Sequence, residues 1–364
     1  MDTKIYTIGS PEKDADKLNE AGRVLRGGGL VVFPTETVYG LGGNATDEEA
    51  ARKIYAAKGR PSDNPLIIHV AEPREAETYA VTSPLFYRLA QAFMPGPLTL
   101  ILPKKAVIPY SVTGGLESVA VRCPSHPIAH ALIAAAGVPV AAPSANLSGK
   151  PSPTCASHVI EDLSGRVDII LDGGECDIGV ESTILKIDGN VPILLRPGGI
   201  TYEQLCRICG KVEIAEAVLG RLRPGERPLS PGMMYRHYAP ETPLILVRGE
   251  PTAVTAYLRA RQAEGCGVLC YTEEIEALTC ARRIVLGHRH DPAEQAQHLF
   301  TALRDADHLG VPKLYTHFPD ETGMGLALCN RMLRAAAYQV VDIDQGFTIE
   351  RKETKHGEET KSAD

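Results

Sequence analysis

Short apolar runs alternate with amphipathic stretches along the first 210 residues of the chain. A run such as Leu30–Phe33 is long enough for a buried strand and too short for a helix. Further strands are predicted at 66–70, 98–102, 119–122, 138–142, 169–171, 183–187 and 193–195, and helices at 11–26, 84–93, 126–136, 154–163 and 201–209. This alternation is typical of an α/β or α+β domain around one large twisted sheet, here residues 1–212.

One more helix is predicted from its start signal. The hydroxyl of Thr46 can cap the free amides while Glu49, three residues later, reaches back to the cap. We expect this helix to run to about Ala57. Lys58 and Arg60 follow its end, and we expect both side chains to face solvent.

The second half of the chain repeats the alternation on a smaller scale. Proline and glycine crowd residues 220–243, which rules out a regular element, so 213–243 is predicted to be a linker between domains. Strands are predicted at 244–247, 267–270, 284–286 and 314–317, and helices at 251–263, 291–306 and 323–338. They indicate a small Rossmann-like parallel α/β domain over 244–345, without the GxGxxG turn of a dinucleotide site. The charged stretch 346–364 is predicted to be a disordered tail.

Composition narrows the functional classes. The net charge of −7 argues against a protein that grips nucleic acid through a broad basic face, although a local basic pocket stays open. No apolar run approaches the roughly 20 residues of a membrane span. The nine cysteines, an odd number, are typical of reduced thiols in a cytoplasmic protein. Cys206 and Cys209 lack the two further ligands of a zinc site, so they are expected to be helix-side thiols.

Polar clusters follow several of the predicted strands. Residues 34–42, PTETVYGLG, follow a strand end, where ligands gather in open α/β sheets, although a hydrogen-bonded turn explains them at least as well. In Lys58-Gly59-Arg60 a point cation stands beside a forked guanidinium, a pair that suits a polyphosphate. Basic residues that offset the dipole of the preceding helix are an equally good interpretation of this pair.

A third cluster, residues 141–149, again takes a strand into a polar loop, with Ser144 and Asn146 on one side. Arg122 and Arg196 end apolar strands, and such charges are rarely buried without a partner. That partner is either an anionic ligand or an internal carboxylate. A lone histidine in an apolar strand, such as His69, is usually a satisfied core residue.

Read in order, these segments resemble one family. PTETVYGLG, KGRPSDNPL, VAAPSAN followed by SG, GVESTI and LRPGGI closely resemble the YrdC/YwlC family, the L-threonylcarbamoyladenylate synthases, over roughly residues 10–210. The segment SPGMMYRHYAP at 230–240 and the α/β half after it look like the long, two-domain form of that family.

The resemblance implies a twisted open mixed sheet, flanked by helices, around a deep and positively lined cavity. It also implies a reaction in which L-threonine, bicarbonate and ATP give threonylcarbamoyl-AMP and pyrophosphate. A Mg²⁺ ion is expected on the triphosphate, with no protein ligand. A downstream threonylcarbamoyl transferase complex would then modify tRNA, so tRNA is an indirect partner.

The resemblance also implies roles for individual residues. ATP would be bound by Lys58, Arg60, Asn64, Ser118, Ser144, Asn146, Ser152, Arg196 and Tyr235. L-Threonine would be bound by Thr37, His69, Arg122, Ser182 and the backbone of Ala142. Tyr235 lies in the linker, which is expected to cover the active site. The chain departs from the family here, because Met234 stands where a lysine is common.

Two other functions compete with this interpretation. A carbamoyl transferase can use a related domain, but such proteins carry added acylphosphatase-like and zinc-finger modules, for which this chain has neither the length nor the CxxC pairs. A double-stranded RNA-binding module is the second alternative. The net charge of −7 and the lack of stacking aromatic residues argue against it.

Overall fold

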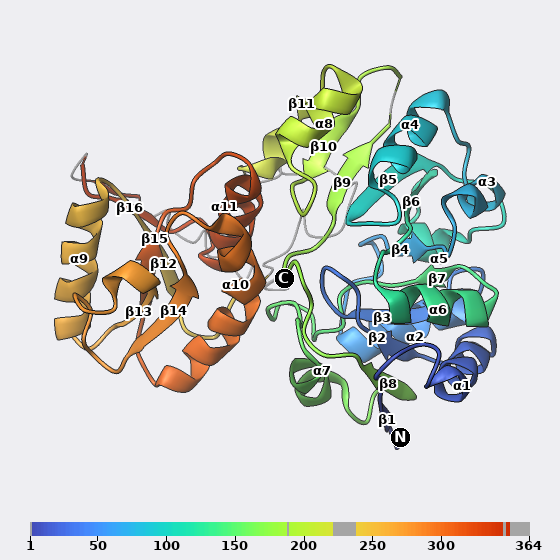
Figure 1. Cartoon of the computed structure of the whole chain (residues 1–364), viewed down its shortest axis with the longest axis horizontal. Helices are drawn as coiled ribbons and strands as arrows, with labels where there is room; N and C mark the ends of the chain where they lie inside the picture. The colour runs from blue at the N-terminus through green and yellow to red at the C-terminus, as the bar shows by residue number, and fades with distance from the viewer. Residues whose placement is uncertain (1, 188, 221–237, 345–346, 350–364) are drawn as a thin grey trace, which may run out of the picture.

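The computed structural model describes residues 2–187, 189–220, 238–344 and 347–349. These residues form two α/β bodies, each built on its own sheet (Figure 1). The N-terminal body holds an eleven-stranded sheet and the C-terminal body, yellow to red in Figure 1, a six-stranded one. The predicted fold class, a mixed sheet followed by a smaller α/β domain, is confirmed.

The first sheet mixes parallel and antiparallel neighbours. Its strand order is β1-β8-β2-β3-β7-β4-β6-β5-β9-β10-β11; β2 pairs with β8 in parallel and with β3 antiparallel. The strands are β1 Lys4–Thr7, β2 Val31–Phe33, β3 Gly40–Asn44, β4 Ile67–His69, β5 Leu98–Pro103, β6 Ser118–Arg122, β7 Val140–Ala141, β8 Ile169–Asp172, β9 Thr183–Lys186, β10 Ile193–Arg196 and β11 Glu213–Ile214.

Helices cover both faces of this sheet. They are α1 Ala15–Arg26, α2 Glu48–Lys58, α3 Ala76–Tyr79, α4 Pro84–Phe93, α5 Tyr110–Thr113, α6 Pro127–Ala136, α7 Ala156–Leu163 and α8 Tyr202–Cys209, with 3₁₀ turns η1 Pro73–Glu75 and η2 Glu216–Val218. α1 and α6 share one apolar core, whereas α2, α4, α7 and α8 pack into another. Cys206 and Cys209 are free thiols on α8, as expected.

Two local predictions in this body are wrong. The cap of α2 is Asp47, whose side chain accepts from the Glu49 N–H, while Thr46 instead bonds the Asn44 Oδ1. Gly40–Gly42, predicted as part of a loop, lie in β3 between β2 and β7. Glycine is needed there because a Cβ on Gly42 would lie 2.8 Å from a Val140 methyl. A strand in which three of five residues are glycine has no alternating pattern to be recognised in the sequence.

The C-terminal sheet is parallel except for its last strand. Its order is β14-β13-β15-β12-β16-β17, and only β17 runs antiparallel to its neighbour. The elements are β12 Leu244–Arg248, α9 Pro251–Ala263, β13 Gly267–Tyr271, η3 Thr272–Glu274, β14 Arg283–Gly287, α10 Pro292–Ala306, η4 Asp307–Leu309, β15 Leu314–His317, α11 Met324–Ala335, β16 Val340–Asp342 and β17 Phe347–Ile349. No described helix in either body is both long and apolar enough to cross a membrane.

Two short strands lie in segments that were predicted to be linker and tail. The linker was expected to begin at residue 213, but Glu213–Ile214 form β11, which pairs with β10 at the edge of the first sheet. Phe347–Ile349, expected to belong to a disordered tail, form β17 against β16. Strands of two or three residues are too short to show the alternation of apolar and polar positions by which a strand is predicted. Residues 221–237 and 350–364 lie outside the described part of the chain.

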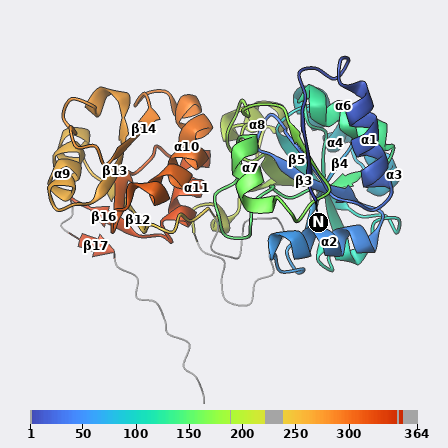
Figure 2. The same ribbon diagram turned by 90° about the horizontal axis from the view of Figure 1, so that it is seen from below.

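The two bodies meet through α10 and α11. Figures 1 and 2 place these helices on the side of the second sheet that faces the first body, with α9 on the opposite side. Val38 and Val180 of the first body belong to the same buried apolar cluster as Phe300 of α10 and Leu328 of α11. The approach is close, because a Cβ on Gly179 would lie 2.3 Å from the Gln297 Cα. The C-terminal domain is therefore packed against loops that connect strands of the first sheet, β2 to β3 and β8 to β9.

Candidate functional site

A cavity in the first body gathers the polar clusters that lie far apart in the sequence. It is bounded by the loop after β2, the end of α2, the ends of β4, β6 and β10, and the loop after β7. Its lining residues are Thr35, Val38, Tyr39, Gly40, Lys58, Arg60, Ile67, His69, Arg122, Ala142, Pro143, Ser144, Asn146, Ser148, Gly149, Lys150, Ser152, Glu181, Ser182, Arg196 and Tyr238. Five of them are lysines or arginines and one is a carboxylate.

Lys58 and Arg60 are held on the cavity wall by the end of α2. Gly59 takes a left-handed backbone conformation, φ 61°, which ends the helix and turns the chain between the two cations. The expectation that both side chains face solvent is wrong: Lys58 is 2% exposed and Arg60 9% exposed. The helix end is buried beneath the loop after β7, and a sequence pattern at one helix end does not report what packs over it.

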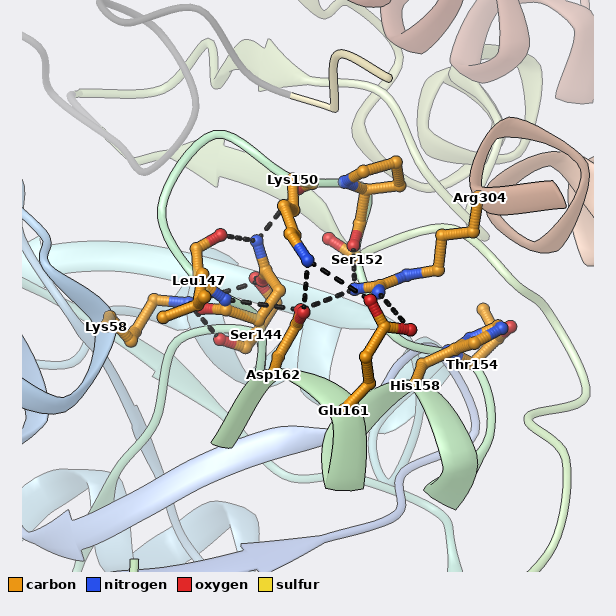
Figure 3. A network of polar contacts seen from close by, with 12 residues as sticks. Lys58, Ser144, Leu147, Lys150, Ser152, Thr154, His158, Glu161, Asp162 and Arg304 are labelled. Atoms are coloured by element: carbon orange, nitrogen blue, oxygen red, sulfur yellow. Dashed lines mark hydrogen bonds and ion pairs between the residues drawn. The ribbon is translucent and has the colours of Figure 1, made fainter. Parts of the chain in front are cut away.

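Lys58 binds the loop after β7 directly. Its ammonium donates to the carbonyl of Ser144, to the carbonyl of Asn146 at 2.5 Å and to the Asn146 Oδ1 at 3.2 Å (Figure 3). The Ser144 hydroxyl donates to the same Oδ1 at 2.6 Å. Burial lowers the pKa of Lys58 well below its usual value, and the charge of Arg60 lowers it further. An anion in the cavity would oppose both effects and favour the charged form.

Arg122 and His69 form the opposite wall, at the ends of β6 and β4. Arg122 pairs with the buried Glu36, Nη2 to Oε1 at 2.8 Å, so the internal carboxylate considered for it is present. Burial raises the pKa of Glu36, but the charge and hydrogen bond of Arg122 outweigh that effect and hold it below its usual value. The Arg122 Nε has no hydrogen-bond partner among the described residues. Arg122 therefore keeps donor capacity for a ligand in the cavity.

His69 is a neutral group in this wall. It is 3% exposed, and its Nδ1 lies 3.3 Å from the Val140 carbonyl. Burial lowers the pKa of His69 to about 3, with a further contribution from the charge of Arg122. The imidazole is therefore uncharged near neutral pH and can exchange hydrogen bonds with a ligand without adding charge.

Arg196 is oriented by Ser182. Its Nε donates to the Ser182 carbonyl at 3.0 Å and its Nη2 to the Ser182 hydroxyl at 3.1 Å. That hydroxyl also lies 2.7 Å from the Thr99 Oγ1 on β5. Burial lowers the pKa of Arg196 to about 10, so the guanidinium is still charged near neutral pH. Its hydrogen bonds go to neutral oxygens, while its charge interacts with the nearby carboxylate of Glu181.

The C-terminal domain supports this wall from behind through Arg331. This arginine of α11 is 0% exposed, and its Nε donates to the Glu181 Oε2 at 2.6 Å. The other carboxylate oxygen of Glu181 accepts from Ser152 at 2.5 Å. Burial raises the pKa of Glu181, but the charges of Arg331 and Arg196 outweigh it and bring the pKa to about 2. Glu181 is thus a fixed anion that ties α11 to two cavity residues.

A second bridge between the bodies lies just outside the cavity, around Asp162. Arg304 of α10 donates to the Asp162 Oδ2 at 2.7 Å and to the Pro151 carbonyl at 2.7 Å (Figure 3). Lys150 pairs with the other oxygen of Asp162 at 3.0 Å, and Figure 3 shows the two cations converging on this carboxylate. The loop 144–152 is therefore held by Lys58 from one side and by Arg304 from the other.

The cavity brings together ten of the fourteen residues predicted for the site: Lys58, Arg60, His69, Arg122, Ala142, Ser144, Asn146, Ser152, Ser182 and Arg196. Thr37 is fully buried and bonds Thr35, which lines the cavity in its place. Asn64 lies behind Arg60, which donates to its carbonyl at 3.5 Å. Ser118 starts β6, about 13 Å along the strand from the Arg122 end, and does not line the cavity. Tyr235 lies outside the described residues.

Some lining residues were not singled out from the sequence. Glu181 stands inside the GVESTI motif without a role assigned to it, and Lys150 directly follows the predicted loop. Arg331, which pairs with Glu181 from behind the lining, had a usable signal, since it lies on the same face of a predicted helix as Leu328 and Ala335. A charge in such a position needs a buried partner, but the sequence does not reveal which carboxylate supplies it.

The fold and the cavity define a class of protein. An open mixed α/β sheet that aims four buried cations and several hydroxyls into one cavity binds a small, highly anionic ligand. In the sequence, residues 23–198 match the Sua5/YciO/YrdC family, described as "Telomere recombination", and residues 200–337 match the C-terminal domain of threonylcarbamoyl-AMP synthase.

Known relatives are similar to this chain over nearly its full length. The threonylcarbamoyl-AMP synthase of Bacillus subtilis is 46% identical over 89% of this chain and 94% of its own length, and that of Pyrococcus abyssi is 43% identical over 90% and 96%. Two solved structures of P. abyssi Sua5, one a variant and one complexed with L-threonine, give TM-scores of 0.86 and 0.84 at 42% identity. They cover 93% and 94% of this chain and 98% and 99% of their own chains. The chain belongs to the Sua5/YrdC family of threonylcarbamoyl-AMP synthases, in its two-domain form.

Proposed function

We propose that the chain is an L-threonylcarbamoyladenylate synthase, a nucleotidyltransferase that converts L-threonine, bicarbonate and ATP to threonylcarbamoyl-AMP and pyrophosphate. The observation that carries the proposal is the single cavity in which Lys58, Arg60, Arg122 and Arg196 converge with the hydroxyls of Ser144, Ser152 and Ser182. Its full-length relatives bear the name of this activity.

The lining residues divide into two groups. Lys58, Arg60 and the loop after β7 lie together and would take the ATP phosphates, because cations beside hydroxyls and amides suit phosphate oxygens. His69, Arg122 and Ser182 lie at strand ends across the cavity and would take L-threonine. A guanidinium fork with an unpartnered Nε suits the amino-acid carboxylate, and the neutral His69 suits the threonine hydroxyl or amine.

The proposed reaction needs positioning and charge neutralisation more than a covalent catalyst. Threonine amine and bicarbonate condense to a carbamate with loss of water. A carbamate oxygen then attacks the α-phosphorus, and the bond to pyrophosphate breaks. Lys58, Arg60 and Arg196 would offset the charge that accumulates on the phosphate oxygens.

A Mg²⁺ ion is proposed to enter on the phosphates of ATP. The one carboxylate in the lining, Glu181, already pairs with Arg331 and Ser152. Within the described residues no group of three histidines, cysteines or carboxylates could hold a metal ion. Phosphate oxygens and water would therefore supply its ligands, and the ion would neutralise phosphate charge beside the cations of the cavity.

The remaining assignments follow from this reaction. The product would pass to a threonylcarbamoyl transferase complex that modifies tRNA, so tRNA is an indirect partner. We place the protein in the cytoplasm, which suits its nine free thiols. The carbamoyl transferase and RNA-binding alternatives are not favoured, because the relatives that span the whole chain are named for the synthase.

The test is pyrophosphate release by the full chain from ATP, with L-threonine and bicarbonate supplied together or omitted singly. We expect release only with both, and D-threonine is the matched control for the amino-acid site. Equal release without L-threonine would remove the substrate assignment. Release that depends on added double-stranded RNA would favour the RNA-binding alternative instead.

A further inference from the structure

A second cavity, of about 320 Å³, lies entirely within the C-terminal domain. All of its lining residues fall between Val247 and Leu328, so it shares no residue with the cavity of the first body. They come from the ends of β12, β13 and β15 and from the starts of α9, α10 and α11. The cavity therefore sits at the carboxyl edge of the parallel sheet.

The topology of the sheet opens a crevice at this position. β12 and β15 are parallel neighbours. The chain leaves β12 into α9, which packs with Val247 and Tyr315 on one face, and leaves β15 into α11, which packs with Leu246 and Leu314 on the other. Connections that diverge from adjacent strands mark the point where open α/β sheets bind their ligands. The cavity lies at that point.

His317, at the end of β15, brings an unpartnered polar atom to the cavity. It is 6% exposed, and its Nε2 lies 2.7 Å from the Glu274 Oε1. Glu274 also accepts from Arg289 at 2.8 Å, from the Thr255 hydroxyl and from the Tyr271 N–H. A carboxylate accepts only, so the pair places a proton on Nε2. Nδ1 has no partner among the described residues and is left to exchange a hydrogen bond with a ligand.

The other side of the cavity holds one cation. Arg248 lies over the Phe318 ring at 3.9 Å and reaches only a loose ion pair with Glu321 at 3.6 Å, with its side chain half exposed. α11 starts here without a side-chain cap; Glu203 accepts from the Gly323 N–H at 3.2 Å, and Gly325, two residues later, lines the cavity. The amides that follow Gly323 in the first turn of this twelve-residue helix, and a nearby guanidinium, suit a phosphate group.

Asp320 adds an acceptor of a different kind. It lines the cavity between Phe318 and α11 and makes no ion pair among the described residues. A carboxylate beside a phosphate site repels a second phosphate but accepts hydrogen bonds from hydroxyl groups, as at the ribose of a nucleotide. With the Nδ1 of His317, the cavity has two groups that can bond hydroxyls and one cation for a phosphate.

From this arrangement we propose that the C-terminal domain has a binding site of its own for a small hydroxylated phosphate monoester. The phosphate would lie between Arg248 and the start of α11, and the hydroxyls would face Asp320 and His317. The ligand is a free sugar phosphate or the ribose-phosphate part of a nucleotide. This site goes beyond the proposed synthase function and does not depend on it.

Calorimetric titration of the full chain with ribose 5-phosphate, AMP and inorganic phosphate tests the proposal. The site variants are Arg248→Glu, which changes a half-exposed side chain, and Asp320→Asn. The matched control is Arg282→Glu, an exposed charge reversal just before β14, at the opposite edge of the same sheet. The site variants should each weaken ligand binding about tenfold or more, the effect of losing one charge-assisted contact, while Arg282→Glu leaves it unchanged.

The arms of the titration separate the two sources of ligand. Binding of ribose 5-phosphate that is lost in Arg248→Glu supports the site and identifies a sugar phosphate. Binding that is seen only with AMP and is lost in Arg248→Glu supports the site and identifies a nucleotide. Inorganic phosphate that binds as tightly as either ester would overturn the roles of Asp320 and His317. Absence of Arg248-dependent binding for all three probes would overturn the site itself.

Discussion

The ion pair between Arg331 and Glu181 allows a direct test of how the C-terminal domain acts on the cavity. Arg331→Met removes the guanidinium but keeps an unbranched side chain of similar length in a position that is 0% exposed. The carboxylate of Glu181 then stays buried beside Ser152 without its nearest cation. We expect the variant to be less stable and to bind ATP more weakly, since Glu181 and Ser152 both line the cavity.

The size of the stability loss follows from the cost of leaving a buried charge without its partner. Removing one partner of a buried ion pair costs about 3–5 kcal/mol, because the other charge is left uncompensated. The pKa of Glu181, about 2, results from Arg331, Arg196 and Ser152 acting together against burial, so Arg196 and Ser152 still stabilise the carboxylate in the variant. We therefore expect a loss of about 3 kcal/mol at neutral pH, the lower end of that range.

The same pair predicts a dependence on pH. The pKa of Glu181 is lower in the folded protein than in the unfolded chain, so its contribution is complete above about pH 4.5 and is lost as the pH falls towards 2. Urea unfolding of the wild type, Arg331→Met and a Glu181→Leu/Arg331→Met double variant measures both effects. The double variant should regain most of the lost stability, because it contains no unpaired buried charge. A single variant as stable as the wild type would refute the reasoning, and so would a double variant no more stable than the single one.

Two further predictions concern the cavity of the first body. Lys58→Met should abolish pyrophosphate release. It should also lower the free energy of unfolding by about 2 kcal/mol or more, because the carbonyls of Ser144 and Asn146 lose a buried donor. An inactive variant of unchanged stability would contradict the role of Lys58 in holding the loop 144–152. His69 has a pKa of about 3 in the folded protein, so the unfolded chain takes up its proton first as the pH falls below 6.5. Between pH 7 and pH 5, the free energy of unfolding measured in urea should therefore fall by about 2 kcal/mol less in His69→Gln than in the wild type. Equal losses in the two proteins would disprove the buried, neutral state of His69.

Much of the fold could be predicted because its elements carry strong local patterns. The apolar runs at β5 and β6 and the start of α4 at Pro84 were placed within about two residues, the usual error of such boundaries. The elements that were missed lack that pattern. β3 is made mainly of glycine, and β1, β11 and β17 are short strands at or beside a sheet edge. These strands form because neighbouring strands pair with them, and a short stretch of sequence does not show which strands will be neighbours.

The cavity was predictable as a set of motifs, whereas its electrostatics were not. The motifs of the first body lie where strands end or begin, or at the end of α2, and the packing of these elements on one sheet brings them together. The partner of each buried charge could not be predicted, because it lies far away in the sequence. Glu36 and Arg122 are 86 positions apart in the chain, and Glu181 and Arg331 are 150 apart. Lys58 was expected in solvent because the loop that buries it begins 86 residues later.

These long-range pairs bear on why the second domain is present. Arg331 and Arg304 come from the two helices that face the first body, and each ends on a carboxylate that also holds part of the cavity. Asp162 binds Lys150, and Glu181 binds Ser152, so both bridges act on the loop 144–152 that Lys58 holds from the other side. If the C-terminal domain moves, it therefore changes the position of that loop through charged groups that are costly to separate. A ligand in the cavity of the C-terminal domain, at the start of α11, would lie on the same helix that carries Arg331.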